Sequence, residues 1–408
     1  MPKSKFIVEG LAGAKTLRGS IAVGGAKNAV LKALAASVLF DDEMPLERVP
    51  DIEDVKRMRE LLESLKTDPT VLRRDIAERM RASVVLTGPV LARRGSVTFP
   101  FPGGCVLGER PIDLFLDGYK AMGATVEERG DLFTISGKLK GAHITFPFVS
   151  VTATETLMMA ATLADGETTL ENAAMEPEIP DLAYYLNECG ANIKGAGSSV
   201  ITITGGKPLR ANGIAYVTPP DRIEAGSFVI LAALVGDGVT VTNCEPAHMQ
   251  ALLTLLRRAG VNIEEGKDFV RVTKGGAYKS VAVRTHEYPG FPTDLQAPMA
   301  VFLSQAQGEA TILETIFDGR FRYVDDLIRM GADITVMNPH RILIRGPRIL
   351  TDKRLESPDL RAGLAYILAA AVAEGTSTIE NAYTIDRGYE KIELRLQKLG
   401  LNIKREEV

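Results

Sequence analysis

Apolar residues along the chain gather in six segments that carry few charges. An apolar pattern without a polar face is typical of a helix that is buried on all sides. We therefore predict six buried helices, within the segments AKNAVLKALAASVL, MRASVVLTGPVLA, TATETLMMAATLADG, IEAGSFVILAALVGDG, DLQAPMAVFLSQAQGEA and DLRAGLAYILAAAVAEG.

A second set of segments is amphipathic, with apolar residues three and four positions apart, and each leads into a tetrapeptide such as GANI. These tetrapeptides begin at Gly123, Gly190, Gly260, Gly331 and Gly400, so their spacings are 67, 70, 71 and 69 residues. A short pair of β-type segments follows most of them, as in VITITG and ILIRG. The pattern predicts six repeated units, each running buried helix, strand, amphipathic helix, strand, strand.

The first repeated unit is shorter than the others. Ala29 and Ala82 hold equivalent places in successive buried helices and are 53 residues apart, whereas the next two such spacings are 71 and 72 residues. The stretch KTDPTVLRRDIAERMRAS has neither the tetrapeptide nor the β-type pair. We predict that this unit lacks one or two strands. The repeat itself fits both a six-unit solenoid and two similar domains of three units.

Composition narrows the class of protein. With 408 residues the chain is too long for one core, and its 45% hydrophobic and 25% charged residues are those of an ordinary globular protein. A net charge of −4 argues against non-specific nucleic-acid binding. The apolar run at 362–373 is too short to span a bilayer, and MPKSKFIVEG lacks the apolar core of a secretory signal. We expect a cytoplasmic enzyme or binding protein, without membrane insertion.

Cysteines and histidines give no sign of a disulfide framework or a metal site. The chain has three cysteines, and its four histidines form no pair at metal-ligand spacing. We predict no metal, no cofactor and no obligate protein partner. Cys189 is interpreted as a core thiol, and Cys244 as a semi-buried thiol at the end of a strand. Cys105 differs, because PGGCVLGERPID offers no helix or strand period in which a thiol would be buried.

Cations stand at or near the start of four predicted buried helices: Lys27, Arg81, Arg222 and Arg361. Positive charge is unfavourable there by about 0.3–1 kcal/mol, because a helix N-terminus already carries partial positive charge. Their recurrence favours a bound anion, since cations and free N–H groups together form an anion site. The alternative for each cation is an ion pair with a neighbouring carboxylate such as Asp221 or Asp359.

Three more arginines lie in loops that contain glycine or proline: Arg110 in GERPID, Arg320 in DGRF and Arg387 in IDRGY. The guanidinium fork matches the oxygens of phosphate and carboxylate groups. The alternative is that these arginines are solvated surface residues.

Eight motifs follow one another along the chain: GGAKN, RMRAS, PGGCVLGERPIDL, PDRIEAG, YPGFPTDLQAP, DGRF, PDLRAG and IDRGYE. This ordered set resembles the UDP-N-acetylglucosamine enolpyruvyl transferases, of the EPSP synthase-like superfamily, from about Val8 to Lys404. The resemblance implies two similar α/β domains, each an inside-out barrel of three repeated units, with a cleft between them. Residues 25–221 would form one domain, with the Cys105 loop as a lid and the shortened unit near 66–80. Residues 1–24 and 222–408 would form the second, discontinuous domain.

The resemblance also implies a reaction. The family transfers the enolpyruvyl group of phosphoenolpyruvate to the 3′-hydroxyl of UDP-N-acetylglucosamine with release of phosphate, the first committed step of peptidoglycan synthesis. Both substrates are anions, which agrees with the cations above. Cys105 corresponds to the family cysteine that protonates the enol methylene and can form a covalent adduct. Asp294 corresponds to the acceptor of the hydroxyl proton, and Lys27 and Arg387 complete the implied catalytic residues.

Further residues match the family's substrate contacts: Asn28, Arg81, Arg110, Pro111, Ile112, Asp113, Leu114, Ser150, Val151, Thr293, Ile316, Asp359 and Arg361. The resemblance implies that residues 110–114 pack the uracil ring and that Thr293 and Ile316 contact the acetamido sugar. A carboxylate among arginines is a weak base, so we interpret Asp294 as orienting the hydroxyl and accepting its proton late.

Three features depart from the family pattern: the short first unit, Phe115 in place of the usual His, and Thr152 in place of the usual Gly. All three lie in the 25–221 domain, where we expect altered contacts to the nucleotide. The alternatives are a transferase with a different nucleotide or phosphate acceptor, a non-catalytic sugar-nucleotide-binding paralogue, and an RNA-end-processing protein. Cys105, Asp294 and Arg387 together favour an enzyme, and the charge balance disfavours RNA.

Overall fold

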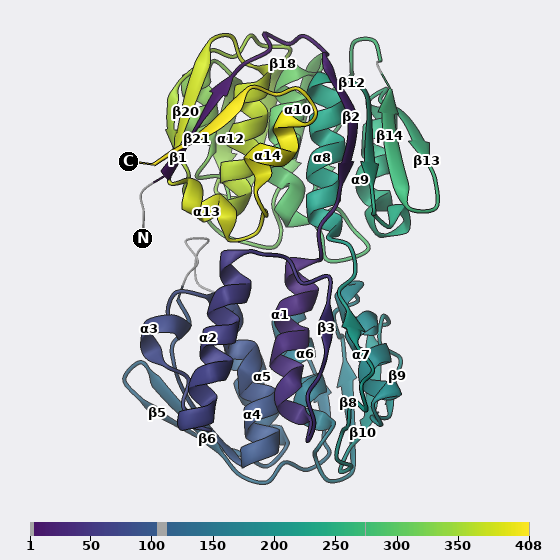
Figure 1. Cartoon of the computed structure of the whole chain (residues 1–408), viewed down its shortest axis with the longest axis vertical. Helices are drawn as coiled ribbons and strands as arrows, with labels where there is room; N and C mark the ends of the chain where they lie inside the picture. The colour runs from purple at the N-terminus through teal and green to yellow at the C-terminus, as the bar shows by residue number, and fades with distance from the viewer. Residues whose placement is uncertain (1–3, 104–111, 274, 408) are drawn as a thin grey trace. The chain divides into compact units, whose positions relative to one another are not determined.

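The computed structural model describes residues 4–103, 112–273 and 275–407, which form two compact units (Figure 1). The inserted unit comprises residues 25–103 and 112–219. The discontinuous unit comprises residues 4–24, 220–273 and 275–407. The chain passes from one unit to the other after Gly24 and after Pro219. The two compact units exclude a continuous six-unit solenoid.

Helices occupy all six predicted buried segments. Their apolar residues are buried along nearly the whole length of each helix, as expected for a pattern without a polar face. The six helices are α1 (Lys27–Ala36), α4 (Thr87–Arg94), α6 (Val151–Ala161), α8 (Arg222–Val235), α10 (Gln296–Gln305) and α12 (Leu360–Val372). The 3₁₀ turns η1 (Ser37–Leu39), η2 (Arg81–Leu86) and η4 (Thr293–Leu295) extend α1, α4 and α10.

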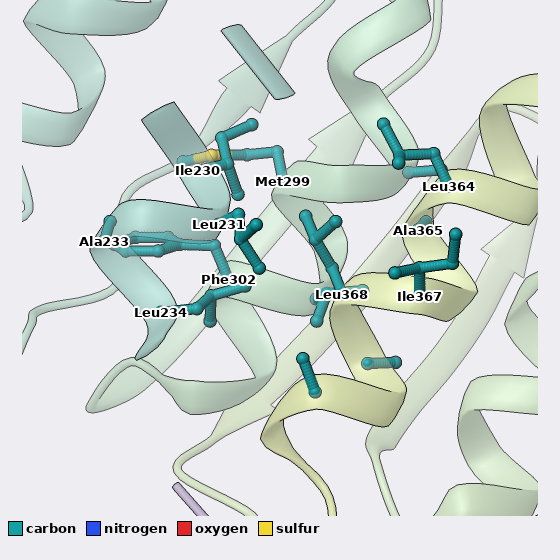
Figure 2. Close-up of a cluster of buried hydrophobic side chains, with 14 of the residues drawn as sticks. Ile230, Leu231, Ala233, Leu234, Met299, Phe302, Leu364, Ala365, Ile367 and Leu368 are labelled. Carbon is teal, nitrogen blue, oxygen red and sulfur yellow. The ribbon is translucent and has the colours of Figure 1, made fainter. Parts of the chain in front are cut away.

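These helices form the cores of the two units. In the discontinuous unit α8, α10 and α12 pack directly against one another, with their apolar side chains between them (Figure 2). A Cβ atom at Gly226 of α8 would lie 2.5 Å from Leu295 Cδ1, so glycine permits the close approach of the turn before α10. In the inserted unit α4 packs against α6, and η2 contacts α1.

Four four-stranded sheets share one strand order. In each, an outer strand pairs in parallel with the strand that follows a buried helix, and two antiparallel strands complete the sheet. The sheet of the third repeat has the order β7 (His143–Thr145), β8 (Glu167–Glu171), β10 (Val200–Thr204), β9 (Ile193–Lys194), and that of the fourth has the order β2 (Leu17–Ala22), β12 (Gly236–Thr242), β14 (Phe269–Thr273), β13 (Asn262–Glu265). The sheet of the fifth repeat has the order β15 (Val283–Arg284), β16 (Gly308–Leu313), β18 (Arg341–Gly346), β17 (Asp333–Asn338). The sheet of the sixth has the order β19 (Arg354–Glu356), β20 (Thr376–Glu380), β1 (Ser4–Glu9), β21 (Ile403–Glu407).

The N-terminal strands complete sheets whose other strands come from distant parts of the sequence. β1 pairs antiparallel with both β20 and β21, and β2 pairs in parallel with β12. Phe6 and Val8 of β1 are fully buried in the discontinuous unit. The sixth repeat therefore takes its last strand from the start of the chain.

The shortened first repeat has lost its antiparallel strands. β3 (Leu46–Glu47) pairs in parallel with β11 (Tyr216–Val217), and no strand lies in residues 48–95, all of which are described. The helix α2 (Glu53–Thr67) is followed by the short α3 (Arg74–Ala77). The prediction that this repeat lacks strands is confirmed.

The second repeat has a reduced version of the common sheet. Its strands β4 (Ser96–Pro100), β6 (Leu132–Ser136) and β5 (Thr125–Arg129) are antiparallel. A single parallel bridge from Val71 to Thr98 stands where the outer strand lies in the other sheets.

The predicted amphipathic segments form α5 (Asp113–Ala121), α7 (Glu178–Glu188), α9 (Gln250–Arg258), α11 (Val324–Met330) and α14 (Ile392–Gln397). The turn η3 (Pro246–Met249) precedes α9, and the short α13 (Ala382–Asp386) lies outside the predicted segments. Each unit is thus built from three repeats around buried helices, and the predicted class of two similar inside-out α/β domains is confirmed. Among the helices of residues 4–103, 112–273 and 275–407, none combines the length and apolarity needed to cross a membrane.

Lys32 on α1 and Glu155 on α6 form an ion pair inside the inserted unit, with Nζ 3.2 Å from Oε2. Glu155 is fully buried, and neither of its carboxylate oxygens has a well-oriented hydrogen bond within the described part of the chain. Burial raises the pKa of Glu155 to about 7, against the opposing effect of Lys32, and Glu178 and Glu176 add to the rise. The core therefore holds a carboxyl group that keeps its proton well above the usual range.

We expect Glu155→Gln to become more stable relative to the wild type as the pH rises. The ordinary pKa of Glu155 is 4.5 and its folded value is about 7, so the folded state binds more protons between these values. The contribution of Glu155 to stability is fully present below pH 4.5 and falls by about 3 kcal/mol as the pH rises to 7 and above. Urea unfolding of both proteins at about pH 5 and pH 8 measures the change. A pH-independent difference between them would contradict the expectation.

Candidate active site

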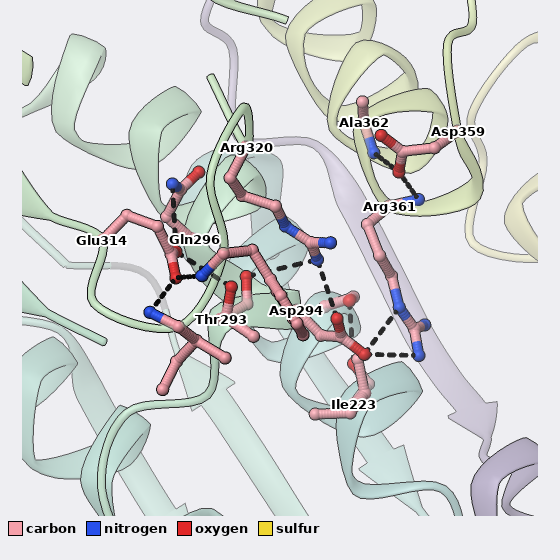
Figure 3. A network of polar contacts seen from close by, with 12 residues as sticks. Ile223, Thr293, Asp294, Gln296, Glu314, Arg320, Asp359, Arg361 and Ala362 are labelled. Carbon is pink, nitrogen blue, oxygen red and sulfur yellow. Dashed lines mark hydrogen bonds and ion pairs between the residues drawn. The ribbon is translucent and has the colours of Figure 1, made fainter. Parts of the chain in front are cut away.

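A turn before α10 carries Asp294, whose carboxylate lies between two arginines (Figure 3). Arg320 Nη2 is 2.7 Å from Oδ1, and Arg361 Nε and Nη2 are 3.1 and 3.0 Å from Oδ2. The side chains of Arg320 and Arg361 are 5% and 6% exposed, whereas that of Asp294 is 25% exposed. A ligand can therefore reach the carboxylate while two buried guanidiniums fix its orientation.

Arg361 is held by a second partner as well. Its Nη1 donates a hydrogen bond of 2.9 Å to the hydroxyl of the buried Tyr389. Burial lowers the pKa of Arg361, but Tyr389, Asp294 and Asp221 together outweigh it and raise the pKa above its ordinary value. Arg361 is thus a permanent buried cation. Two guanidiniums therefore hold the Asp294 carboxylate from both sides.

Asp359 caps α12 at the edge of this cluster. Its Oδ1 accepts hydrogen bonds from Arg361 N at 2.8 Å and from Ala362 N at 3.1 Å, and Asp221 caps α8 in the same way. A capping carboxylate satisfies free N–H groups and offsets the positive end of the helix. The expected alternative, an ion pair of Arg361 with its neighbour Asp359, is wrong, because the partner is Asp294, 67 residues earlier.

Lys27 begins α1 in the inserted unit, and its ammonium lies 2.7 Å from Oδ2 of the buried Asp54 on α2. The second glycine of GGAKN has a steric reason, since a Cβ atom at Gly25 would lie 2.2 Å from Arg48 O. The start of α1 is thereby held against the loop that follows β3. A buried cation at a helix start is the feature that the sequence pattern indicated.

The other predicted residues of the inserted unit stand at helix starts. Ser150 is the N-cap of α6, where its hydroxyl accepts a hydrogen bond of 3.2 Å from Ala153 N. Arg81 is the first residue of η2, which leads into α4. The remaining residues are Asn28 in the first turn of α1, Val151 at the start of α6, and Ile112, Asp113 and Leu114 at the start of α5. Cys105, Arg110 and Pro111 lie outside the described residues.

Phe115 and Thr152 have ordinary structural roles. Phe115 is 2% exposed and its ring centroid lies 6.4 Å from that of Phe99 and 6.1 Å from that of Tyr119. The side chain of Phe115 belongs to the apolar core, and the expectation that the contacts to a nucleotide are altered here stays a prediction. Thr152 lies in the first turn of α6 with φ in the ordinary range, so no glycine is required there.

Thr293 and Ile316 are joined by one carboxylate, that of Glu314. Thr293 Oγ1 donates to Oε2 at 2.9 Å (Figure 3). Ile316 N donates to Oε1 at 2.8 Å. Arg387 follows α13 directly and is half-buried, two residues before Tyr389. The discontinuous unit thus assembles one polar cluster around Asp294, and the inserted unit has the Lys27–Asp54 pair.

Sequence reasoning missed Asp54, Glu314 and Tyr389, and it noted Arg320 only as a loop cation. Tyr389 and Arg320 lie within IDRGYE and DGRF, so those motifs could have drawn attention to them. Asp54 and Glu314 give no local signal, because only tertiary packing distinguishes a buried carboxylate from a solvated one. In the described part of the chain, no group of three histidine, cysteine or acidic residues could hold a metal ion.

The chain is similar to known proteins along nearly its whole length. Residues 11–396 match the family described as EPSP synthase (3-phosphoshikimate 1-carboxyvinyltransferase). A UDP-N-acetylglucosamine 1-carboxyvinyltransferase from Acidobacterium capsulatum is 44% identical over 98% of this chain and 96% of its own. Another from Magnetococcus marinus is 45% identical over 96% of this chain and 98% of its own. The chain belongs to this carboxyvinyltransferase family.

Solved structures share the fold of this carboxyvinyltransferase. The enolpyruvyl transferase NikO from Streptomyces tendae matches with a TM-score of 0.86 at 22% identity, over 100% of both chains. EPSP synthase from Acinetobacter baumannii matches with a TM-score of 0.75 at 18% identity, over 99% of this chain and 100% of its own. These similarities establish the inside-out α/β fold of the family.

Proposed function

We propose that this carboxyvinyltransferase transfers the enolpyruvyl group of phosphoenolpyruvate to the 3′-hydroxyl of UDP-N-acetylglucosamine and releases phosphate. The observation that carries the proposal is an identity of 42–45%, over nearly the whole chain, to relatives named UDP-N-acetylglucosamine 1-carboxyvinyltransferase. The step belongs to peptidoglycan synthesis, and we assign it to the cytoplasm. The proposal includes no nucleic acid and no protein partner.

Asp294 acts on the hydroxyl in this proposal. Its carboxylate orients the 3′-hydroxyl and accepts the proton as the sugar oxygen bonds to C2 of the enolpyruvyl group. Because two guanidiniums stabilise its ionised form, Asp294 is a weak base that takes the proton late. Arg320 and Arg361 act as positioning residues for this carboxylate.

Cys105 supplies a proton to the methylene carbon in the same addition. When the bond from C2 to the phosphate oxygen then breaks, the protonated carbon, which is now a methyl group, gives up a proton. The double bond is thereby restored in the product. This role needs a thiol whose pKa lies near the working pH, and a cation beside a thiol provides this by favouring the thiolate. Cys105 lies outside the described residues, and its role rests on the PGGCVLGERPID motif.

The cations bind the anionic parts of the substrates. Lys27, Arg81, Arg110 and Arg387 hold phosphoenolpyruvate and the phosphate that leaves, and oriented cations of this kind stabilise charge that develops in the transition state. Further contacts to the substrates come from Asn28, Pro111, Ile112, Asp113, Leu114, Ser150, Val151, Thr293, Ile316, Asp359 and Arg361.

We expect the purified protein to release phosphate from phosphoenolpyruvate only when an acceptor is present. UDP-N-acetylglucosamine is the expected acceptor, and mass spectrometry should find the enolpyruvyl ether on it. The panel of other acceptors includes other nucleotides, their sugar conjugates and shikimate 3-phosphate. Activity restricted to a different acceptor would contradict the substrate assignment, and no release with any acceptor would contradict the enzymatic reaction itself.

A further inference from the structure

Glu314 is a buried carboxylate for which the proposed reaction has no direct use. It follows β16 immediately, and it is 1% exposed. Its Oε1 accepts hydrogen bonds from Ile316 N at 2.8 Å and Phe317 N at 3.1 Å. Its Oε2 accepts from Thr293 Oγ1 at 2.9 Å and Gln296 Nε2 at 3.3 Å (Figure 3). Both oxygens are therefore occupied by donors of the protein itself.

These donors come from two separate segments. Thr293 and Gln296 flank Asp294 in the turn that leads into α10, and the two amides belong to the loop after β16. The same loop supplies Arg320, which donates to Thr293 O at 3.4 Å and to Asp294 Oδ1 at 2.7 Å. Glu314 and Arg320 thus connect the turn and the loop at two points.

The side chain of Gln296, the second donor from the turn, has a fixed orientation. Gln296 is fully buried, and its Oε1 accepts a hydrogen bond of 2.6 Å from the hydroxyl of Tyr323, which is also buried. The amide of Gln296 therefore cannot rotate without losing this bond, and its NH₂ group must face Glu314. A carboxylate is the one common side chain that accepts four hydrogen bonds in this position.

We infer that Glu314 is a positioning residue for the reaction, which sets Asp294 and the Ile316 loop in the geometry that the sugar requires. This inference rests on the proposed function, in which Asp294 takes the hydroxyl proton and Thr293 and Ile316 contact the acetamido sugar. Glu314 acts through these residues, because its own oxygens are satisfied by the protein. A residue with only a structural role would change stability without changing the substrate dependence of the folded enzyme.

The variant Glu314→Gln tests this role with almost no change in volume. Its side-chain oxygen can still accept from the two loop amides, but its NH₂ group then faces the NH₂ group of Gln296. Two donors in contact leave a buried polar group unsatisfied, so the turn moves relative to the loop. We expect kcat to fall about tenfold and the KM for UDP-N-acetylglucosamine to rise about tenfold, with the KM for phosphoenolpyruvate unchanged.

The double variant Glu314→Gln and Gln296→Glu exchanges the two side chains and tests whether the kinetics are rescued. The carboxylate at 296 can accept from the new NH₂ group at 314 and from Tyr323, the Thr293 hydroxyl can accept from the same NH₂ group, and the charge of the site is kept. We expect kcat and both KM values to return close to those of the wild type. Glu393→Gln is the matched control, since Glu393 is a buried carboxylate bound to Arg405 in the same unit.

All variants are assayed at a temperature at which circular dichroism shows them folded. Wild-type kinetics in Glu314→Gln, or the same change in Glu393→Gln, overturns the inference while the proposed function stands. A rescue that restores the unfolding temperature but not the KM for UDP-N-acetylglucosamine also overturns it. A wild-type protein that is inactive with UDP-N-acetylglucosamine overturns the proposed function first, and the inference with it.

Discussion

Asp294→Asn should lower kcat by about 10²–10⁴-fold, which is the usual contribution of a positioned general base. The amide can still accept a hydrogen bond from one arginine, but it cannot take the hydroxyl proton. It also leaves Arg320 and Arg361 buried without a carboxylate, so we expect some loss of stability. Phosphate release at saturating substrates measures kcat, and binding of UDP-N-acetylglucosamine measured calorimetrically should change far less.

Asp326→Asn is the matched control for this experiment. Asp326 lies in the same unit, its side chain is 19% exposed, and it accepts from Arg329 at 2.6 Å and from Tyr366 OH at 2.7 Å. It resembles Asp294 in burial and in its arginine partner, but its donors Arg329 and Tyr366 are not among the residues proposed to bind the substrates. Equal losses of kcat in the two variants would assign the effect of Asp294→Asn to stability and contradict its role as a proton acceptor.

The repeated architecture could be predicted because it depends on local patterns. Buried helices have no polar face wherever they lie. The missing strands of the first repeat shorten the spacing between the first two buried helices. The outer strands β7, β15 and β19 could not be predicted, because two or three residues are too few to show an alternation. The pairing of β1 with β20 and β21 joins opposite ends of the chain, which no local pattern records.

The ion-pair partners in the candidate site could not be predicted from the sequence, for a related reason. The cations at helix starts could be identified individually, but an ion pair between Arg361 and Asp294 depends on the packing of α12 against α10. The nearest carboxylate in sequence, Asp359, serves as a helix cap instead. The packing of Phe115 is a similar case, since its motif position gives no sign that its ring lies against those of Phe99 and Tyr119.

Lys27→Met should lose both activity and stability. Lys27 binds phosphoenolpyruvate in the proposed function, and loss of one such group lowers kcat by about 10²–10³-fold. The ammonium also neutralises Asp54, which is 2% exposed, so the variant leaves a buried carboxylate without its partner. Removing one member of a buried ion pair costs about 3–5 kcal/mol of unfolding free energy. Phosphate release and urea unfolding measure the two effects separately.

A second substitution separates the two roles of Lys27, because Asp54→Asn removes the charge that Lys27→Met leaves unpaired. The double variant should recover most of the lost stability and none of the lost activity. Lys32 gives a close control, since it lies on the same helix, has the same 11% side-chain exposure and also pairs with a buried carboxylate. The double variant Lys32→Met and Glu155→Gln should therefore keep its activity. If it lost as much activity as the Lys27 and Asp54 pair, the loss would come from the packing of α1 rather than from a cation that holds phosphoenolpyruvate.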